Sequence, residues 1–592
     1  MKERGLQWNL KDIVKDEEEF FNIIKKIEGE IQGYDIIFKE TSNDMKEAKF
    51  KRMIDFQEKI TTQFGRINSY VSLLSSIDSK SQKVMKYQST LDELGIKIAD
   101  KSRPINHWLQ GLEVRNKKPL DDKNAKRLFK AIPDLEWTLH DTRKKAKHTL
   151  KEEIEQVIQR KNINGIDAIT ELYEKITTNL SFEFAPYGKE KKIIKNQEEL
   201  IKYVKHPKKE YRKAAYEALL RTYKEQKETL YTIYAAVIKD WKMEQELRKY
   251  TSPINMRNSA NDIEDEIIET VLKVVVKNRK IYQELFKIKA KELGMKKLSR
   301  TDIYAPLSKE EKRVSFEEAK KLVLETYKNF HPEFAKRAEQ VFNQEHMDSH
   351  PKENKRGGAF CAYITPQITP YILLNYTETE RDVSTMAHEL GHAIHDLYTK
   401  RLPYAAAHAP LPLAETASTF GEMLLFEELL KQASKKKKKE LLMNKLADSY
   451  ATIARQTYFI KFEKEAHEKI PRGLSEEELS KLYLAQLEEL FGDTVNIPDY
   501  FQYEWLYIPH IFHTPFYCYA YSFGDLLTLA LYAQYKKEGK KFIPRLERIL
   551  SAGGSKNPVE LLNKEGFDIT KEAFWEEGFK VIRSWLEEVK TL

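Results

Sequence analysis

The amino-acid sequence predicts a mostly helical protein that carries one small β-sheet. Gly and Pro are sparse, at 21 and 20 of 592 residues, so we expect long regular elements and few loops. Apolar side chains recur at three- and four-residue steps over most of the chain, which is the spacing along one face of an α-helix. Only a few short segments gather aromatic and β-branched residues between turn residues, as strands do.

Five segments carry the helical pattern most clearly, and two shorter ones carry the strand pattern. The helical segments are Glu17 to Ile31, Lys208 to Ser252, Asp262 to Leu293, Phe316 to Phe342 and Glu476 to Leu490. The second of these contains no Gly or Pro and predicts a long amphipathic helix or a helix pair. The strand candidates are G-G-A-F-C-A-Y-I-T, from Gly357, and P-Y-I-L-L-N-Y-T, from Pro370.

A weaker strand signal, from Leu180 to Ile194, marks the expected division of the chain. The division is placed just after it: residues 1–196 form an N-terminal helical region, and residues 197–592 form the expected catalytic portion. Because 592 residues exceed what one hydrophobic core supports, more than one compact unit is expected.

Composition excludes several classes of protein. The aromatic content, 31 Tyr and 28 Phe, is too high for a disordered chain. Lys and Arg total 101 against 92 Asp and Glu, so the net charge of +9 is spread thinly. The one basic run, Lys435 to Lys439, has no interleaved aromatic residues and favours a solvated helix start over a nucleic-acid patch. We therefore expect no nucleic-acid partner.

The cysteine count and the apolar runs predict a cytoplasmic protein. Cys361 and Cys518 are too few for a disulfide framework or a Cys-rich metal site, and they suit a reducing compartment. No apolar run reaches the ~18 residues that a membrane span needs, and the first residues lack the apolar segment of a signal peptide. We expect no membrane partner, and the oligomeric state is left open.

The segment T-M-A-H-E-L-G-H-A-I-H-D, from Thr385, predicts a catalytic metal site. Residues four apart share one helix face, so His388 and His392 can bind the same ion. Glu389 follows the first ligand and can reach a water molecule as general base without being a ligand itself. Two neighbouring histidines in an apolar helix need a partner, and a metal ion supplies it.

A catalytic zinc ion needs a third protein ligand. A histidine six residues beyond His392 would supply it in one class of enzyme, but that position is Tyr398. His395 is only three residues on, and we interpret it as a neighbour of the site. Downstream, L-P-L-A-E-T-A-S-T-F-G-E places Glu415 among small residues that allow close approach of two helices. Glu415 is our candidate third ligand, and Glu422 is either its supporting partner or a carboxylate at the edge of the core.

Further motifs accompany these two: W-N-L-K-D-I near the start, N-K-R-G-G-A-F-C-A-Y, P-H-I-F-H-T-P-F-Y-C-Y-A-Y-S-F-G and L-S-A-G-G-S-K-N-P-V-E-L-L. In this combination the chain resembles the oligoendopeptidase F branch of the thimet-oligopeptidase-like zinc metallopeptidases. The resemblance covers nearly all the chain and is loosest in the N-terminal region.

The resemblance implies a two-lobed helical body around a deep cleft, with one zinc ion per chain on the cleft floor. It implies endopeptidase action on short peptides, because the cleft excludes folded proteins. The zinc ligands carry over to His388, His392 and Glu415, and the general base carries over to Glu389.

The same resemblance places a histidine and tyrosines of the C-terminal motif over the zinc. Thr514 and Pro515 predict the start of a helix, which puts Tyr517 and Tyr521 on one face. We expect His513 and Tyr521 to stabilise the developing oxyanion, and His510 and Tyr517 to contact substrate. For each tyrosine, Tyr519 included, the alternative is a place in the aromatic core.

The strand from Gly358 is a candidate substrate site. Gly358 and Ala359 begin a segment whose edge can bind an extended peptide through backbone hydrogen bonds. Three other functions are weighed against the zinc endopeptidase: a cysteine peptidase using Cys361 or Cys518, a non-catalytic peptide-binding protein, and a zinc hydrolase of another substrate. A non-catalytic peptide-binding protein would leave the position of Glu389 beside two histidines unexplained.

Overall fold

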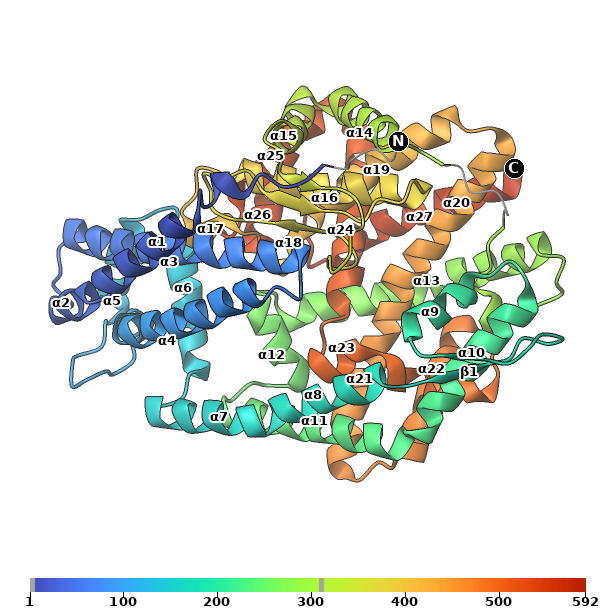
Figure 1. Cartoon of the computed structure of the whole chain (residues 1–592), viewed down its shortest axis with the longest axis horizontal. Coiled ribbons are helices and arrows are strands. Elements are labelled where there is room, and N and C mark those ends of the chain that lie inside the picture. Colours follow the sequence, from blue (N-terminus) through green and yellow to red (C-terminus); the bar gives the residue numbers. More distant parts are fainter. Residues whose placement is uncertain (1–5, 308–312) are drawn as a thin grey trace. The chain divides into compact units, whose positions relative to one another are not determined.

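The computed structural model describes residues 6–307 and 313–592 and confirms the mostly helical class (Figure 1). The chain divides into two compact units, each assembled from three segments. The first unit comprises Met1–Lys147, Glu311–Lys431 and Gln534–Phe567, and the second comprises His148–Glu310, Gln432–Ala533 and Asp568–Leu592. The sequence predicted that the catalytic portion begins at residue 197, and this boundary stays a prediction.

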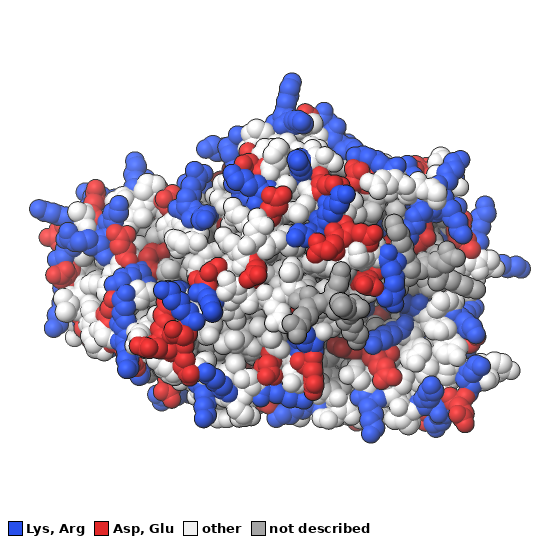
Figure 2. Space-filling model, turned by 45° about the horizontal axis from the view of Figure 1, so that its top comes forward, with Lys and Arg blue, Asp and Glu red and all other residues white. Residues whose placement is uncertain are grey.

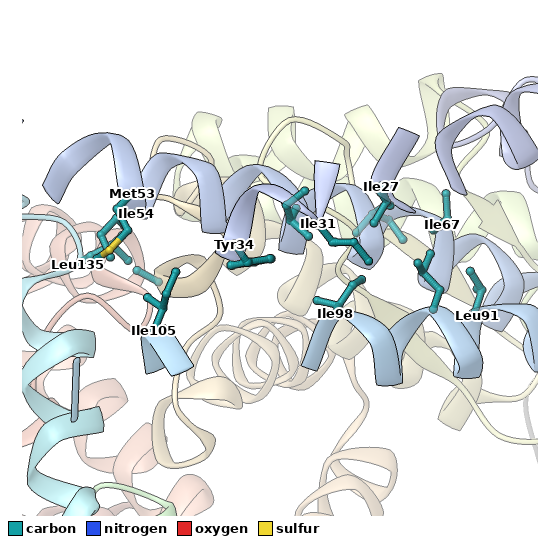
Figure 3. Close-up of a cluster of buried hydrophobic side chains, with 14 of the residues drawn as sticks. Ile27, Ile31, Tyr34, Met53, Ile54, Ile67, Leu91, Ile98, Ile105 and Leu135 are labelled. Carbon is teal, nitrogen blue, oxygen red and sulfur yellow. The ribbon is translucent and has the colours of Figure 1, made fainter. Parts of the chain in front are cut away.

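The N-terminal part of the first unit is a layer of helices: α1 (Glu17–Glu30), α2 (Gly33–Lys39), α3 (Glu47–Ile77), α4 (Gln82–Gln110), α5 (Asp122–Lys130) and α6 (Glu136–Lys145). The helix predicted from Glu17 is α1, which Asp16 caps through the backbone N–H of Glu19. Figure 3 shows the apolar side chains of α1 to α4 meeting between the helices, with Ile27 and Ile31 facing Ile67, Leu91 and Ile98. This buried apolar surface holds the layer together.

The rest of the first unit contains a three-stranded sheet together with further helices. Its elements are α14 (Phe316–Phe330), α15 (Pro332–Asn343), β4 (Met347–Asp348), β5 (Phe360–Ala362), β6 (Tyr371–Leu373), α16 (Glu380–Tyr398), α17 (Tyr404–Ala407), α18 (Leu411–Ala414), α19 (Thr416–Gln432), α25 (Ile543–Ala552) and α26 (Pro558–Lys564). The helical pattern over 316–342 is two helices, because Pro332 cannot continue α14 and begins α15 instead.

The sheet lies beside the helix that carries the two metal-ligand candidates, as predicted. Its order is β4-β6-β5, with β6 parallel to β4 and antiparallel to β5, so β5 is an edge strand. Cys361 of β5 stands opposite Ile372 of β6, and both strands pack against α16. The two strand segments predicted from Gly357 and Pro370 are therefore confirmed as β5 and β6.

A buried lysine ties the sheet to the loop that leads into β5. Nζ of Lys355 donates to Oδ1 of Asp348 at 2.6 Å, to the carbonyl of His350 at 2.7 Å and to the carbonyl of Leu374 at 2.5 Å. The Lys355 side chain is fully buried, and Asp348 is 1% exposed. This one ammonium group therefore joins β4, the end of β6 and the connecting loop.

The second unit is also mostly helical. Its helices are α7 (Glu152–Asn164), α8 (Ile166–Thr178), α9 (Gln197–Lys202), α10 (Lys209–Glu225), α11 (Lys227–Leu247), α12 (Pro253–Ala260), α13 (Asp265–Glu292), α20 (Lys435–Ser449), α21 (Arg455–Lys469), α22 (Glu476–Phe491), α23 (Pro509–His513), α24 (Tyr519–Glu538) and α27 (Glu572–Thr591). The pairs β1 (Phe182–Phe184) with β2 (Lys192–Ile194), and β3 (Leu298–Ser299) with β7 (Val495–Asn496), are its only strands among the described residues.

The predicted helices of this unit are present. The segment from Lys208 to Ser252 is the helix pair, α10 and α11, with the break at Gln226. The patterns over 262–293 and 476–490 correspond to α13 and α22, and α27 packs against α13 and α20. The basic run begins α20, where Ser434 caps the helix and Lys438 and Lys439 pair with Glu588 and Glu292.

Charged side chains of both signs are interspersed on the face drawn in Figure 2. No helix in the described part of the chain has the length and apolarity that crossing a membrane requires. The prediction that the chain lacks a signal peptide depends partly on residues 1–5, which lie outside the described residues.

Replacing the buried lysine tests whether the sheet depends on it. We expect Lys355→Met to lower the stability of the first unit by about 3–5 kcal/mol, because it leaves Asp348 buried beside one cation fewer. The matched control is Lys352→Met, since Lys352 binds the other oxygen of Asp348 at 2.7 Å but is 30% exposed. Urea denaturation measures both, and an equal loss in the two variants would contradict the assignment.

Candidate metal centre

Helix α16 presents both candidate histidines and the glutamate between them on one face. Its start is fixed by a capping box, in which Thr379 and Asp382 each accept a hydrogen bond from the other's backbone N–H. Farther along, the hydroxyl of Tyr327 in α14 donates to the carbonyl of Ala387 at 2.5 Å. These contacts set the position of the turn that carries His388.

A close crossing of two helices brings the third candidate to this face. A Cβ atom on Gly391 would lie 2.5 Å from Cα of Ser418 and 2.6 Å from the carbonyl oxygen of Ala417, so only glycine fits. The structure places Glu415 at the residue before α19, and Ser418 donates to its Oε2 at 2.8 Å. The predicted close approach of small residues is confirmed at this crossing.

Three side-chain atoms form a nearly equilateral triangle. Nε2 of His388 lies 3.2 Å from Nε2 of His392, and Oε2 of Glu415 lies 3.3 Å from the first and 3.4 Å from the second. Ligand atoms at about 2.0–2.1 Å from a tetrahedral zinc ion stand about 3.3 Å apart. Among the described residues this is the one group of three or more ligating side chains close enough to share an ion.

The proton on His388 can be assigned from its other partner. Nδ1 of His388 lies 2.5 Å from Oε1 of Glu422, so Nδ1 carries a proton, and Nε2 is the nitrogen that can offer its lone pair to an ion shared with Glu415 and His392. Of the two alternatives for Glu422, the structure favours the supporting partner. Ligand atoms that converge in this way need a proton or a metal ion between them, and the three residues fit a metal ion.

The electrostatics of the centre also favour a cation. Burial lowers the pKa of His388, but its hydrogen bonds to Glu415 and Glu422 outweigh burial and hold the pKa well above the ordinary value. Burial raises the pKa of Glu415, but its hydrogen bonds to His388 and His392 outweigh burial and hold that pKa well below the usual range. Positive charge at this point is therefore stabilised by two carboxylates.

A cavity of about 370 Å³ opens on the centre, and Glu389 lines it beside the three candidate ligands. Burial raises the pKa of Glu389, against the lowering effect of His388 and His392. His395 also lines the cavity but lies outside the triangle, as predicted. Burial lowers the pKa of His395 to about 3, so its imidazole is neutral.

Sequence reasoning did not single out the residues at the rest of the cavity wall. Asp396 lies one turn beyond His392 on the same face of α16, and Tyr363 and His408 line the cavity with it. The helical spacing 388, 392, 396 could have indicated Asp396, whose pKa burial raises to about 7. No sequence spacing indicated Tyr363 or His408, because they come from separate loops.

Neither cysteine is suited to be a nucleophile. Burial raises the pKa of Cys361 and of Cys518 well above the ordinary thiol value, so both stay protonated. Cys361 lines the cavity, whereas Cys518 is fully buried.

The candidate substrate strand reaches the same cavity. Gly358 adopts a left-handed φ of +77°, and its carbonyl accepts a hydrogen bond from Nδ2 of Asn375 at 2.8 Å. Ala359 follows and lines the cavity, and β5 begins at Phe360. This turn leads the backbone from the loop directly into the edge strand.

The His–Tyr segment, residues 510–521, lies in the second unit and gathers three of the four predicted side chains. Nε2 of His510 lies 3.3 Å from the hydroxyl of Tyr521, and the rings of Tyr517 and Tyr521 meet edge to face at 5.4 Å. All three residues are partly exposed, in contrast to Tyr519, which is buried and accepts a hydrogen bond from Asn261. Tyr519 therefore belongs to the core.

The fourth side chain, that of His513, faces another helix. Its Nε2 lies 2.9 Å from Oε1 of Glu174 in α8, and its ring meets Tyr173 edge to face at 5.5 Å. The structure thus pairs Tyr521 with His510. The roles assigned to these four residues stay predictions.

The helix predicted to start at Thr514 starts later, at Tyr519, so that prediction is wrong. Thr514 instead follows the last residue of α23, and Phe516 has a φ of +59°, which a right-handed helix cannot contain. The N–H of Phe516 donates to Oε1 of Glu463 in α21 at 2.8 Å. A tertiary contact therefore fixes a turn where the local sequence favours a helix.

The sequence model of peptidase family M3 matches residues 202–581 of the chain. The chain belongs to peptidase family M3. Membership of the M3 family makes it a metalloendopeptidase, which confirms the predicted enzyme class and the resemblance stated from its motifs.

Named relatives of this M3 peptidase align over nearly its full length. Oligopeptidase PepF of Bacillus subtilis is 26% identical over 604 residues, covering 99% of this chain and 87% of that protein. An oligoendopeptidase F homolog of Borreliella burgdorferi is 27% identical over 614 residues, covering 99% and 98%.

Solved structures share the fold of the M3 peptidase. A putative peptidase from Chlamydophila abortus superposes with a TM-score of 0.86 at 22% identity, covering 99% of this chain and 98% of that one. Oligoendopeptidase-F from Enterococcus faecium gives a TM-score of 0.70, also at 22% identity, covering 97% and 98%.

The helix crossing can be tested by adding one methyl group. We expect Gly391→Ala to push α19 away, to displace Glu415 and to weaken metal binding at least about tenfold. The control is Gly29→Ala in α1, where a new Cβ meets nothing within 4 Å. Metal content after equilibrium dialysis measures the effect, and full occupancy with unchanged affinity in Gly391→Ala would refute the role of the crossing.

The buried carboxyl of Glu463 predicts a pH dependence of stability. Burial raises its pKa from 4.5 to about 8. Between these values the unfolded chain loses the proton and the folded chain keeps it, so stability is fullest below pH 4.5 and declines as pH rises through 8. Glu463→Gln cannot ionise, so its stability relative to wild type should rise by up to a few kcal/mol across this window. Urea denaturation at several pH values measures the difference in unfolding free energy. If the free energies of the two proteins change in parallel with pH, the raised pKa of Glu463 is excluded.

Proposed function

We propose that this M3 peptidase is a zinc-dependent endopeptidase that hydrolyses internal bonds of short oligopeptides, with one Zn²⁺ held by His388, His392 and Glu415. The observation that carries the proposal is the triangle of three ligand atoms, at the spacing that a tetrahedral zinc ion requires. Two imidazole nitrogens and one carboxylate oxygen are a usual ligand set of catalytic zinc, and they leave a fourth position open.

When bound, zinc supplies Lewis acidity, which lowers the pKa of a water molecule and polarises the scissile carbonyl. Glu422 supports the centre by accepting a hydrogen bond from Nδ1–H of His388, which leaves Nε2 as the nitrogen that binds the ion. Ser418 donates to the Glu415 carboxylate through its hydroxyl. Gly391 allows α19 to approach α16 closely enough for Glu415 and Glu422 to reach His388.

Glu389 is the proposed general base. It takes a proton from the attacking water and later gives it to the leaving amine, so the reaction proceeds without a covalent intermediate. Its place in the cavity wall beside the ligands supports this role. Burial raises its pKa, which makes its carboxylate a better proton acceptor.

The His–Tyr segment supplies the proposed hydrogen-bond donors. Tyr521 and His513 are assigned to the oxyanion, and His510 and Tyr517 to the substrate. The 3.3 Å contact with His510 supports Tyr521 as an oriented donor, because an Nε2–H of His510 that donates to the hydroxyl oxygen leaves the O–H proton of Tyr521 for the oxyanion. The partial exposure of these side chains supports access to a substrate.

The edge of β5 is the proposed docking site for the substrate backbone. Gly358 and Ala359 precede this strand, whose outer edge no other strand pairs with among the described residues. An extended peptide added there gains main-chain hydrogen bonds whatever its sequence. Relatives named as an oligopeptidase and an oligoendopeptidase support short peptides as the substrate class. The cytoplasmic location stays a prediction.

The proposal is tested by cleavage of an internally quenched oligopeptide. We expect wild type to cut internal bonds and a chelator to abolish cleavage. Glu389→Gln should keep its metal and lose activity by about 10²–10⁴-fold, because the amide cannot accept the proton of water. Fluorescence rates, product masses and bound metal are measured together.

Two outcomes separate the rival functions. Undiminished cleavage by Glu389→Gln would refute the general base. Bound metal without peptide cleavage in wild type would favour a peptide-binding protein or a hydrolase of another substrate. His388→Ala serves as the comparison variant, because it removes a ligand and should lose metal and activity together.

A further inference from the structure

One peptide group of the His–Tyr segment is held at both of its polar atoms. The carbonyl of Pro515 accepts a hydrogen bond from Nε of Arg257 at 3.0 Å. The N–H of Phe516, which belongs to the same peptide plane, donates to Oε1 of Glu463 at 2.8 Å. Because the peptide group is planar, holding both atoms fixes its rotation.

The two holding residues come from different helices of the second unit. Arg257 lies in α12 and rests over the ring of Trp241, 5.6 Å from its centroid. Glu463 lies in α21 and is completely buried. Its second oxygen, Oε2, has no hydrogen-bond partner among the residues that the structure describes. Burying a carboxyl that makes a single hydrogen bond costs free energy of folding. The contact with Phe516 should therefore serve a structural or functional purpose.

The reason lies in the backbone that follows. Phe516 has a φ of +59°, which a bulky residue rarely adopts. Such a conformation persists only where surrounding contacts over-determine it. The ring of Phe516 is buried beside His467, one turn beyond Glu463 on α21, at 4.6 Å between ring centroids. Backbone and side chain of Phe516 are thus both fixed by α21.

This turn determines where the tyrosines point. Tyr517 comes directly after Phe516, and α24, which carries Tyr521, begins two residues later. His510 precedes the turn, contacts Tyr521 at 3.3 Å and stacks with Tyr517 at 6.1 Å between ring centroids. A rotation of the held peptide group would move Tyr517 and the start of α24 relative to His510.

We infer that Arg257 and Glu463 are positioning residues that hold the peptide group of Pro515 and Phe516 and thereby orient the His510–Tyr521 pair for catalysis. The inference rests on the proposed function, in which that pair meets the substrate. Neither residue is among the candidate ligands or the residues that line the cavity. They act through the turn, and a misplacement of donors by about 1 Å costs about 10²-fold in rate.

A purely structural role predicts a different result. If Glu463 only stabilised the fold, its variants would lose stability while the folded fraction kept its kcat. A positioning role lowers kcat of fully folded enzyme and leaves metal content unchanged, because the candidate ligands lie in the first unit.

The test compares two substitutions of Glu463 in the full-length, metal-loaded enzyme. Glu463→Gln keeps an oxygen that accepts from Phe516, and its kcat should stay within about threefold of wild type. Glu463→Leu removes the acceptor, and its kcat should fall at least about tenfold with KM and metal content little changed. Asp302→Asn is the control, since Asp302 is an equally buried carboxylate that pairs with Arg212, and its kcat should match wild type.

Arg257→Met is the second variant, chosen because Arg257 is partly exposed and its loss is easier to tolerate. It removes the hydrogen bond from Arg257 to the carbonyl of Pro515 and should lower kcat as Glu463→Leu does. Folded Glu463→Leu or Arg257→Met enzyme with the kcat of wild type would overturn the inference.

A double variant separates this inference from the proposed function. Tyr521→Phe alone should lower kcat, and adding Glu463→Leu should then cost much less than it costs in wild type, because the same donor is already lost. An unchanged kcat in Tyr521→Phe would refute the proposed role of Tyr521. A lowered kcat in Tyr521→Phe with an undiminished further loss from Glu463→Leu would refute the positioning role instead.

Discussion

The close crossing of α16 and α19 at Gly391 is the constraint on which the candidate metal centre depends. Without a Cβ atom at this point, the backbone at Ser418 approaches α16 and sets Glu415 against the histidines. The same approach brings Glu422 to His388. The glycine of the H-E-L-G-H motif is therefore as much a part of the centre as its ligands, although it carries no chemistry.

The candidate functional residues form two groups, one in each compact unit. The triangle of ligand atoms, Glu389 and the β5 edge belong to the first, and the His–Tyr segment belongs to the second. Each group is positioned by contacts within its own unit. In the first unit the crossing of α16 and α19 positions the ligands. In the second, hydrogen bonds from Arg257 and to Glu463 fix the peptide group between Pro515 and Phe516. Substitutions can therefore perturb the donors and the metal ligands separately.

Local patterns predicted the helices well because each buries one apolar face, and this requirement appears directly in residue spacing. The break at Pro332 is equally local, since proline cannot continue a helix. The start predicted at Thr514 was wrong, because the preference of Thr and Pro for a helix start is weaker than the contacts that α12 and α21 make with the turn. Local sequence patterns also could not predict which segments form each unit, because each unit joins segments that lie far apart in the chain.

By itself, the sequence determined the helical class, the metal-ligand candidates and the family resemblance, because a motif at helical spacing places its side chains whatever surrounds it. Helix packing places Glu422 beside His388, buries Tyr519 in the core, pairs His510 with Tyr521 and brings Asp396 and His408 to the cavity wall. These facts depend on which helices pack together and how closely they approach, and short-range spacing carries no information on either.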